Sequence, residues 1–278
     1  MDQKVAVVTG SSSGIGLATA LLLARNGFYT YATMRNLDKS KGIVDVAKKE
    51  KLPLQVIRLD VNDDKSVKDA VNKIVEEKKR VDVLVNNAGY MLAGCVEDLS
   101  IDEVKAIFET NLFGILRVTQ AVLPTMRKQG SGIIVNVSSV AGRISFPVTP
   151  AYISTKFALE GLSESMRYEL EQFGIKVILV EPGVVRTDIS GNMKMARKAM
   201  DPNSPYAQLT QKVSTGFKLL VDHGTPPEEV AKVILKAITS ENPDPRYLVG
   251  NDAAIIMEAR KNMSDIEFEK FIKKEILQ

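Results

Sequence analysis

Short apolar segments recur along the chain and alternate with longer amphipathic ones. Several of the short segments, such as VAVV and VILV, are apolar without interruption. An uninterrupted apolar run of this length is typical of a parallel strand that is covered on both faces. Seven segments have the character of strands: Lys4–Thr9, Phe28–Met34, Leu54–Val61, Val81–Val85, Gly132–Val137, Ile175–Glu181 and Arg246–Val249.

The segments between these runs carry the start and stop signals of helices. Gly27 follows a helix-length apolar run and is a good left-handed stop. Ser100 and Glu103 have the spacing of a capping box. Strands that alternate with helices form right-handed crossovers. The predicted fold class is therefore α/β: a Rossmann-like, doubly wound, mostly seven-stranded parallel sheet with helices on both faces.

No repeat, low-complexity linker or clean boundary divides the chain, so residues 1–278 are expected to form a single domain. One region, at about 188–224, breaks the alternation. It is rich in Met, Ser, Pro and Asn and contains no evident strand. Because it follows a strand end, where α/β proteins place ligands, we interpret it as a short insertion that forms a lid over a substrate.

Composition narrows the class of protein. The chain is 45% hydrophobic and 26% charged, with a net charge of only +3 and no concentrated basic face, which argues against nucleic-acid binding. Cys95 is the single cysteine, so an intrachain disulfide is impossible and a His/Cys metal cage is not expected. The first predicted strand leaves no room for a cleavable signal, and no apolar run is long enough to span a bilayer. We expect a soluble cytoplasmic protein without an integral membrane segment.

A glycine-rich motif, TGSSSGIG, joins the first predicted strand to the first predicted helix. Gly10 would allow the tight turn, Gly14 would let the backbone approach a pyrophosphate, and Gly16 would let helix and strand pack closely. The start of the helix would offer free N–H groups to the phosphate. The motif therefore predicts a dinucleotide site rather than a simple turn, formed by Gly10, Ser12, Ser13, Gly14, Ile15 and Gly16.

The end of the second predicted strand bears on the choice of cofactor. An acidic residue there usually binds the ribose 2′-hydroxyl, but this chain has Met34 followed by Arg35. An arginine matches a 2′-phosphate, whereas a carboxylate would repel it. The pattern favours NADP(H), with NAD(H) possible; the alternative is that Arg35 is simply solvated.

Two further strand ends fit the same site. Asp60, followed by Val61, could accept a hydrogen bond from an adenine amino group, could cap the next helix, or could do both. The small residues at the end of the fourth predicted strand would let a cofactor lie against the backbone. They are Asn87, Ala88 and Gly89.

Tyr152 and Lys156 are four residues apart in a predicted helix and would share one face. A cation within about 4–6 Å favours the ionised phenol, so the pair could act as a proton donor and acceptor. A hydroxyl of Ser138 or Ser139 could donate to a substrate oxygen. Asn111 stands in a helical segment, where asparagine is a mediocre helix former, and predicts a local irregularity.

With these motifs assembled, the chain resembles the single-domain branch of the short-chain dehydrogenase/reductase superfamily. TGSSSGIG, NNAG, the serine, YISTK and EPGVVRT occur in that family's order and spacing, between about Lys4 and Asp188, with weaker agreement to Gly250. Within the family it is most similar to the hydroxysteroid and retinol dehydrogenase-like members, through YATMRN, DVLVNNAG and the long run that begins at YISTK.

The resemblance implies a role for each matching residue. Tyr152 would be the general acid/base, while Lys156 would bond the nicotinamide ribose and lower the tyrosine pKa. Ser139, rather than Ser138, would orient the substrate carbonyl. Asn111 would hold a water that links Lys156 to solvent. Further cofactor contacts, reaching the nicotinamide carboxamide and ring, would come from Pro182, Gly183, Val185 and Thr187.

Apolar residues near the motifs predict the kind of substrate. They are Met91, Leu92, Ile144, Phe146, Pro147 and, in the lid, Met193. Such a lining suits a lipophilic small-molecule carbonyl or alcohol of steroid, retinoid or fatty-chain type, with Ser139, Phe146, Tyr152 and Met193 as substrate contacts. The alternative is that these residues only pack the lid.

Two other functions compete with an oxidoreductase. An epimerase or dehydratase of related fold would use the same tyrosine and lysine but usually carries a longer C-terminal domain. An NADP(H)-binding sensor or scaffold without turnover would have no need of the serine and tyrosine together. Because the helices near Ser100–Gln129 and after Tyr152 are apolar on more than one face, a homodimer or homotetramer is expected.

Overall fold

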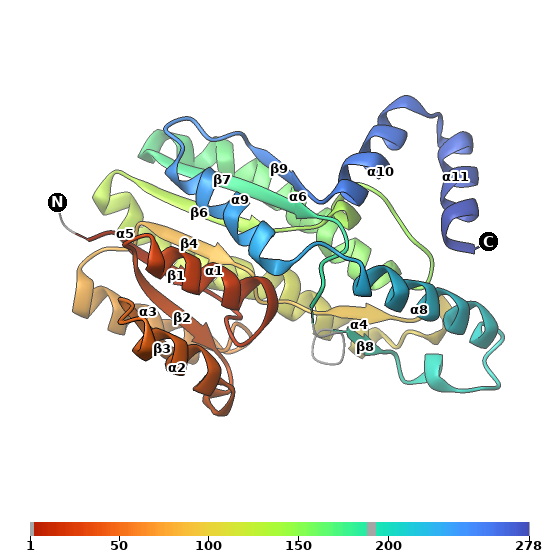
Figure 1. Ribbon diagram of the computed structural model, residues 1–278, viewed down its shortest axis with the longest axis horizontal. Helices are drawn as coiled ribbons and strands as arrows, with labels where there is room; N and C mark the ends of the chain where they lie inside the picture. The colour runs from red at the N-terminus through yellow and green to blue at the C-terminus, as the bar shows by residue number, and fades with distance from the viewer. Residues whose placement is uncertain (1–2, 188–192, 278) are drawn as a thin grey trace.

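The computed structural model of the protein describes residues 3–187 and 193–277. A seven-stranded sheet runs through its centre in the order β3-β2-β1-β4-β6-β7-β9, and each pair of neighbouring strands is parallel (Figure 1). Each of the seven predicted segments overlaps one of these strands, and β4 and β7 extend one residue beyond the predicted ends. They are β1 (Val5–Val8), β2 (Tyr29–Met34), β3 (Leu54–Arg58), β4 (Val83–Asn86), β6 (Gly132–Val137), β7 (Ile175–Pro182) and β9 (Arg246–Val249).

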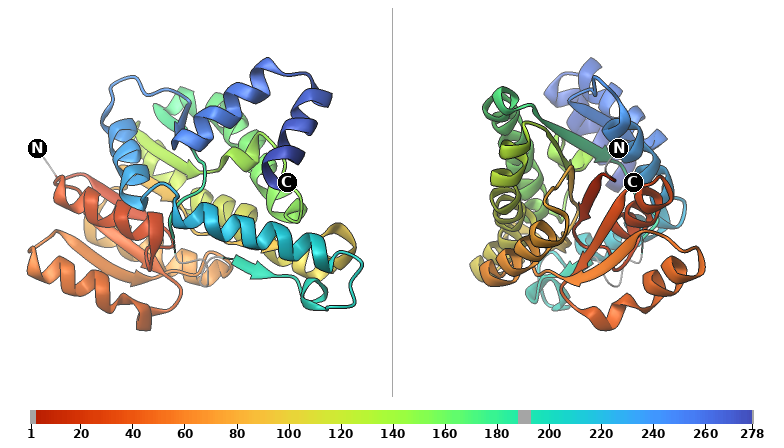
Figure 2. Two further views of the ribbon diagram at one scale, coloured as in Figure 1. Left: turned by 45° about the vertical axis from the view of Figure 1, so that its right-hand side comes forward. Right: turned by 90° about the vertical axis from the view of Figure 1, so that its left-hand side faces the viewer.

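Helices cover both faces of the sheet, so the predicted doubly wound architecture is confirmed. Successive residues of a strand point to opposite faces. Val5 and Val7 pack with α3 (Asp64–Lys78), α5 (Gly114–Gln129) and α6 (Pro150–Leu170). Ala6 and Val8 pack with α1 (Gly14–Arg25), α2 (Lys41–Lys49) and α9 (Pro227–Thr239). Figure 2 shows the two helical layers on either side of the sheet.

Helix ends follow the local signals in the sequence. Gly27 adopts φ +86° just after α1. Ser100 and Glu103 form the predicted capping box at the start of α4 (Ile101–Phe108). The long helical segment predicted after Ser100 is interrupted by a π-helical turn, η3 (Glu109–Phe113), before α5 begins. The predicted irregularity at Asn111 is therefore confirmed.

The predicted lid contains a strand, so the expectation that it has none was wrong. β8 (Met193–Met195) pairs in parallel with β5 (Met91–Ala93), far away in the sequence. A three-residue strand without alternation has no clear local signature, and only its distant partner defines it. Residues 188–192 of the predicted lid lie outside the described residues, and the remainder includes α8 (Ala207–Asp222).

Two further helices, α10 (Asn251–Asn262) and α11 (Asp265–Leu277), form an arm beyond the sheet and above α8 (Figure 1). Within residues 3–187 and 193–277, no helix is both long and apolar enough to cross a membrane. Short 3₁₀ turns complete the fold: η1 (Leu37–Ser40), η2 (Val96–Asp98), η4 (Val140–Gly142), η5 (Glu171–Phe173) and η6 (Lys198–Met200).

Candidate active site

A cavity of about 1310 Å³ opens at the carboxyl ends of the central strands. Its floor comes from residues that directly follow β1, β4, β6 and β7, among them Gly10, Asn87, Ser139 and Gly183. β1 and β4 are neighbours in the sheet, and the chain order reverses between them. In a doubly wound sheet this switch point is where ligands bind, because the loops on either side diverge and leave a crevice.

The structure brings nearly all of the sequence-predicted site residues to this one cavity. Those that line it are Gly10, Ser12, Ser13, Gly14, Ile15, Arg35, Asp60, Val61, Asn87, Ala88, Gly89, Ser139, Phe146, Tyr152, Lys156, Pro182, Gly183, Val185, Thr187 and Met193. Gly16 and Asn111 do not reach the surface of the cavity. Of the other residues expected in an apolar pocket, Leu92 and Ile144 are buried in neighbouring hydrophobic clusters instead.

The glycine-rich turn is tied to the loop that faces it across the switch point. Gly10 has φ +68°, and its carbonyl and that of Thr9 accept hydrogen bonds from Asn87 Nδ2 at 3.2 and 2.9 Å. In return, Thr9 Oγ1 accepts from the backbone N–H groups of Asn87 and Ala88 at 2.9 and 3.0 Å. These bonds hold the turn open beside the start of α1. Sequence reasoning did not single out Thr9, although a hydroxyl at a buried strand end is a usable signal.

A dinucleotide fits this part of the cavity. α1 begins at Gly14, so its first N–H groups are directed at the cavity that Ser12 and Ser13 also line. At the end of β2 the lining consists of Met34, Arg35, Asn36 and Lys39. Arg35 is exposed and Met34 is buried. Lys39, which the sequence analysis did not select, places a second cation beside Arg35.

The structure excludes one of the two roles considered for Asp60. The N-cap of α3 is Asp63, which accepts from the N–H groups of Lys65 and Ser66, so the expectation that Asp60 caps this helix was wrong. Asp60 Oδ1 instead accepts from the N–H of Asn62 at 3.1 Å, and the side chain lines the cavity.

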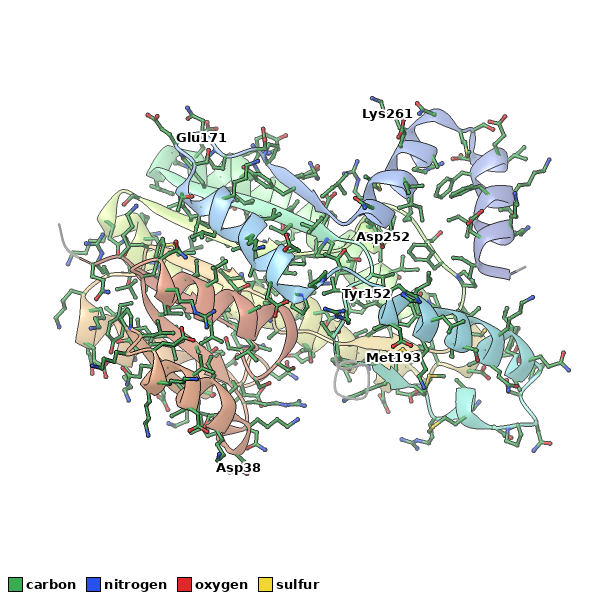
Figure 3. All side chains as sticks on the ribbon, viewed as in Figure 1. Asp38, Tyr152, Glu171, Met193, Asp252 and Lys261 are labelled. Carbon is green, nitrogen blue, oxygen red and sulfur yellow. The ribbon has the colours of Figure 1, made fainter. Side chains whose placement is uncertain are left out.

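Tyr152 and Lys156 project from α6 into the same cavity as Ser139. Lys156 Nζ is 5.7 Å from the centroid of the Tyr152 ring and donates to the carbonyl of Val137 at 2.9 Å. Ser139 accepts from the N–H of Ala141 at 3.1 Å and donates to the carbonyl of Pro182 at 3.3 Å. In Figure 3, Tyr152 lies between Asp252 of α10 and Met193 of β8, both of which line the cavity.

Burial controls the protonation of this pair. It raises the pKa of Tyr152, and the hydrogen bond with Ser139 opposes that rise. It lowers the pKa of Lys156 to about 8, and the negative charge of Glu160 opposes that fall. Sequence reasoning expected the lysine to lower the tyrosine pKa; in the folded protein desolvation is the larger effect. The phenol is therefore held as the neutral proton donor.

Asn111, on the π-helical turn, does not line the cavity but forms hydrogen bonds with segments next to Tyr152 and Lys156. Its Oδ1 accepts from the N–H of Tyr90 at 3.1 Å, and its Nδ2 donates to the carbonyl of Tyr90 at 2.9 Å and to Thr155 Oγ1 at 3.2 Å. Both amide hydrogens are used, so only one lone pair of Oδ1 is left for a water. The side chain thus joins the loop after β4 to α6.

Replacing Asn111 with leucine is expected to lower the free energy of unfolding by about 1–3 kcal/mol, because the half-buried N–H and C=O of Tyr90 lose their partner. Urea unfolding measures the change. Asn62→Leu is the matched control: it also removes an amide bonded to the π-helical turn, at Thr110, but on the exposed surface. An equal loss in both variants would contradict the expectation.

A roof closes the other side of the cavity, and two of its three helices, α10 and α11, lie outside the predicted lid. α8, α10 and α11 all contribute apolar lining: Val213, Phe217, Leu220, Ile255, Ile256, Phe271, Ile272 and Ile276. α10 and α11 also pack on the segment after Ser139, through Val140, Ile144 and Phe146. Asp252 Oδ2 accepts from the N–H of Val184 at 2.6 Å and ties α10 to the end of β7. No group of side chains suited to a metal ion occurs among residues 3–187 and 193–277.

Comparison with known protein families and curated proteins places this geometry among oxidoreductases. The family described as short chain dehydrogenase matches residues 4–198. An uncharacterized oxidoreductase of Bacillus subtilis, YusZ, is 36% identical over 280 residues and covers 99% of each chain. Retinol dehydrogenase 8 of Bos taurus is 40% identical over 250 residues, which cover 86% of this chain and 79% of the relative.

Solved structures agree. A short-chain dehydrogenase from Streptomyces avermitilis has a TM-score of 0.84 and 33% identity, covering 99% of this chain and 97% of the other. An alcohol dehydrogenase from Thermococcus sibiricus, complexed with 5-hydroxy-NADP, has a TM-score of 0.73 and 26% identity over 89% and 96% of the chains. A short-chain dehydrogenase/reductase from Burkholderia phymatum, in complex with NAD, has a TM-score of 0.82 and 26% identity over 96% and 95%.

Proposed function

The chain belongs to the short-chain dehydrogenase family, an oxidoreductase family that acts on CH–OH and C=O groups, and we propose that it is an NADP(H)-dependent enzyme for a lipophilic substrate. One observation carries the proposal: a single cavity joins the glycine-rich turn to Ser139, Tyr152 and Lys156. A protein that only bound the cofactor would not need a proton donor and a hydroxyl facing the same space.

The side chains of the site suit the reduction of a carbonyl group. When bound, a reduced nicotinamide would supply the hydride. As negative charge grows on the carbonyl oxygen, the hydroxyl of Ser139 turns from the carbonyl of Pro182 and stabilises that charge by donating its hydrogen bond to the substrate. The oxygen takes the phenol proton of Tyr152, so that a C–OH group forms and the phenolate of Tyr152 is left beside the cation of Lys156. The same steps in reverse oxidise an alcohol.

The apolar roof supports a lipophilic substrate. Phe146, Phe217 and Ile256 come from three different segments and face one space, and Met193 adds an adaptable side chain at its edge. A steroid, retinoid or fatty-chain carbonyl would replace water along such walls. That one curated relative is named for retinol is in keeping with this substrate class.

The test is turnover of NADPH, followed by its absorbance, with a panel of steroid, retinoid, fatty-chain and small polar carbonyls. We expect turnover with lipophilic carbonyls and little with small polar ones. Turnover of only polar carbonyls would contradict the lipophilic assignment. Tight NADPH binding without turnover of any carbonyl would favour a cofactor-binding sensor.

Preference for NADP(H) is proposed from the end of β2, where the lining carries two cations, Arg35 and Lys39, and no carboxylate among its described residues. Replacing Arg35 with serine is expected to raise the dissociation constant of NADPH about 10- to 100-fold, because a charge-assisted hydrogen bond to the 2′-phosphate is lost. NADH binding should change little. Fluorescence titration with both cofactors measures the difference.

Arg58→Ser is the matched control for this substitution, because Arg58 is also exposed to solvent but lies outside the cavity. It should leave both dissociation constants unchanged. An equal weakening of NADPH and NADH in Arg35→Ser would show that the arginine does not read the 2′-phosphate.

We also propose a cytoplasmic, single-domain protein that forms a homodimer or homotetramer. Buried free Cys95 is compatible with a reducing compartment. Phe113, Phe157 and Tyr168 are 47%, 46% and 79% exposed on η3 and α6, and a second copy that covered them would remove apolar surface from water. Analytical ultracentrifugation tests the assembly, and a monomer at all concentrations would exclude it.

A further inference from the structure

A cluster of charged side chains lies behind the site and takes no part in the steps above. Glu160 of α6 and Glu181 of β7 are 6% and 1% exposed. Arg246 of β9 reaches both, with its Nε 3.2 Å from Glu160 Oε2 and 3.0 Å from Glu181 Oε1. Arg143 contacts Glu181 at 3.4 Å, and Arg246 also pairs with Glu164. Arg143 is exposed, but it is paired with Glu181.

The charges of this cluster do not balance by themselves. Three carboxylates, from Glu160, Glu164 and Glu181, face two guanidinium groups. Buried carboxylates need either a cation or a proton. A proton on Glu181 is one way to compensate the third carboxylate, because burial and the neighbouring Glu160 charge raise the pKa of Glu181 to about 7. A nearby cation is the second way, and Lys156 lies one helical turn before Glu160 on α6.

Glu160 is also packed against the serine segment. A Cβ atom built on Gly142 would lie 2.8 Å from Glu160 Cγ and 3.0 Å from Ser138 Oγ, so the glycine allows this close contact. Glu160 Oε1 is buried and has no hydrogen-bond partner. One oxygen of the carboxylate is thus anchored by Arg246, and the other is unpaired inside the protein.

We propose that Glu160 is a positioning residue for the Tyr152–Lys156 pair: its buried carboxylate, anchored by Arg246 and facing Glu181, keeps Lys156 positively charged beside Tyr152. The inference rests on the proposed function, because it matters for turnover only if Tyr152 is the proton donor. It assigns a purpose to a buried charge that would otherwise only destabilise the fold.

Electrostatics gives the sign of the effect. Burial alone lowers the pKa of Lys156, and the Glu160 charge holds it up at about 8. Without that charge the pKa would fall further, and the lysine would lose its proton in the working range of pH. The titratable and charged groups around the lysine are Tyr152 and Glu160 on its own helix and, through Glu160, Glu181, Arg143 and Arg246.

The first readout is the pH dependence of kcat/KM for NADPH-dependent reduction. In Glu160→Gln the alkaline limb should move to lower pH by about one unit, a tenfold loss of activity on that limb, and Glu160→Asp should restore part of it. Glu164→Gln is the matched control, because it removes a carboxylate that also pairs with Arg246 but lies one turn further from Lys156. Glu164→Gln should leave the alkaline limb of the kcat/KM profile at its original pH.

The second readout does not need turnover. NMR titration of the Lys156 side-chain nitrogen, assigned with Lys156→Met, should give a midpoint of about 8. In Glu160→Gln this midpoint should fall. Glu181→Gln should also move the midpoint downward, but by less, because Glu181 has a pKa of about 7 and is mostly ionised at the midpoint, so its negative charge beside Glu160 is lost. This second shift keeps the test valid if Glu160→Gln does not fold.

The titration separates the two proposals. A large downward shift in Glu160→Gln and a smaller one in Glu181→Gln, in a protein that turns over no carbonyl, would support the role of Glu160 and refute the proposed function. An unchanged midpoint in both variants, or an equal shift in Glu164→Gln, would overturn the role of Glu160 whatever the activity.

Discussion

Replacing Tyr152 with phenylalanine is expected to lower kcat/KM for carbonyl reduction by about 10²- to 10⁴-fold, the range that positioned general acids contribute. The substitution removes only the hydroxyl, so the ring keeps its packing on α6 and against the apolar cluster of Leu92 and Ile107. The substrate oxygen would then have to take its proton from water.

The affinity for NADPH should change little in this variant, because the cradle around Gly10 and Asn87 is made by other segments. Steady-state kinetics and fluorescence titration of the cofactor measure the two effects separately. A large loss of both activity and cofactor affinity would point instead to a misfolded site.

Tyr90→Phe is the matched control. Tyr90 lines the same cavity, but it contacts Asn111 through its backbone N–H and C=O, which the substitution leaves intact. We expect nearly normal turnover. If Tyr90→Phe were as inactive as Tyr152→Phe, the assignment of the proton donor would be wrong.

A second large effect is expected when Gly16 is replaced with alanine. A Cβ at this position would lie 2.4 Å from the carbonyl oxygen of Gly10 and 2.4 Å from Asn87 Nδ2. Neither atom can withdraw freely, because Asn87 Nδ2 donates to the carbonyls of both Thr9 and Gly10. The added methyl group therefore forces α1 away from the turn.

The free energy of unfolding should fall by about 3 kcal/mol, the upper part of the range for overpacked sites. NADPH should also bind more weakly, since Gly10 and Asn87 line the cavity and would be displaced. Urea unfolding and a cofactor titration measure the two losses. Gly42→Ala in α2 is the control: a Cβ there meets nothing within 4 Å, so stability should stay the same or rise slightly. Equal behaviour of the two variants would refute the packing argument.

The sequence determined the strands, the helix ends and the composition of the strand-end loops. A buried parallel strand must be apolar on both faces, and a helix needs its capping groups nearby. Both features can therefore be recognised from residues that are adjacent in the sequence. Because all seven strands run in the same direction, motifs that follow different strands meet at one edge. That is why residues as far apart as Gly10, Ser139 and Gly183 could be assigned to one site before any contact was known.

Only the tertiary structure decided the features that depend on distant contacts or on burial. The pKa of Tyr152 rises because desolvation outweighs the hydrogen bond with Ser139. The addition of α10 and α11 to the roof and the ion cluster around Glu160 join segments far apart in the chain. Neither feature has a local sequence pattern. The sequence alone does not show whether an isoleucine or a glutamate faces solvent or a cavity, because only the packing of distant segments determines its exposure.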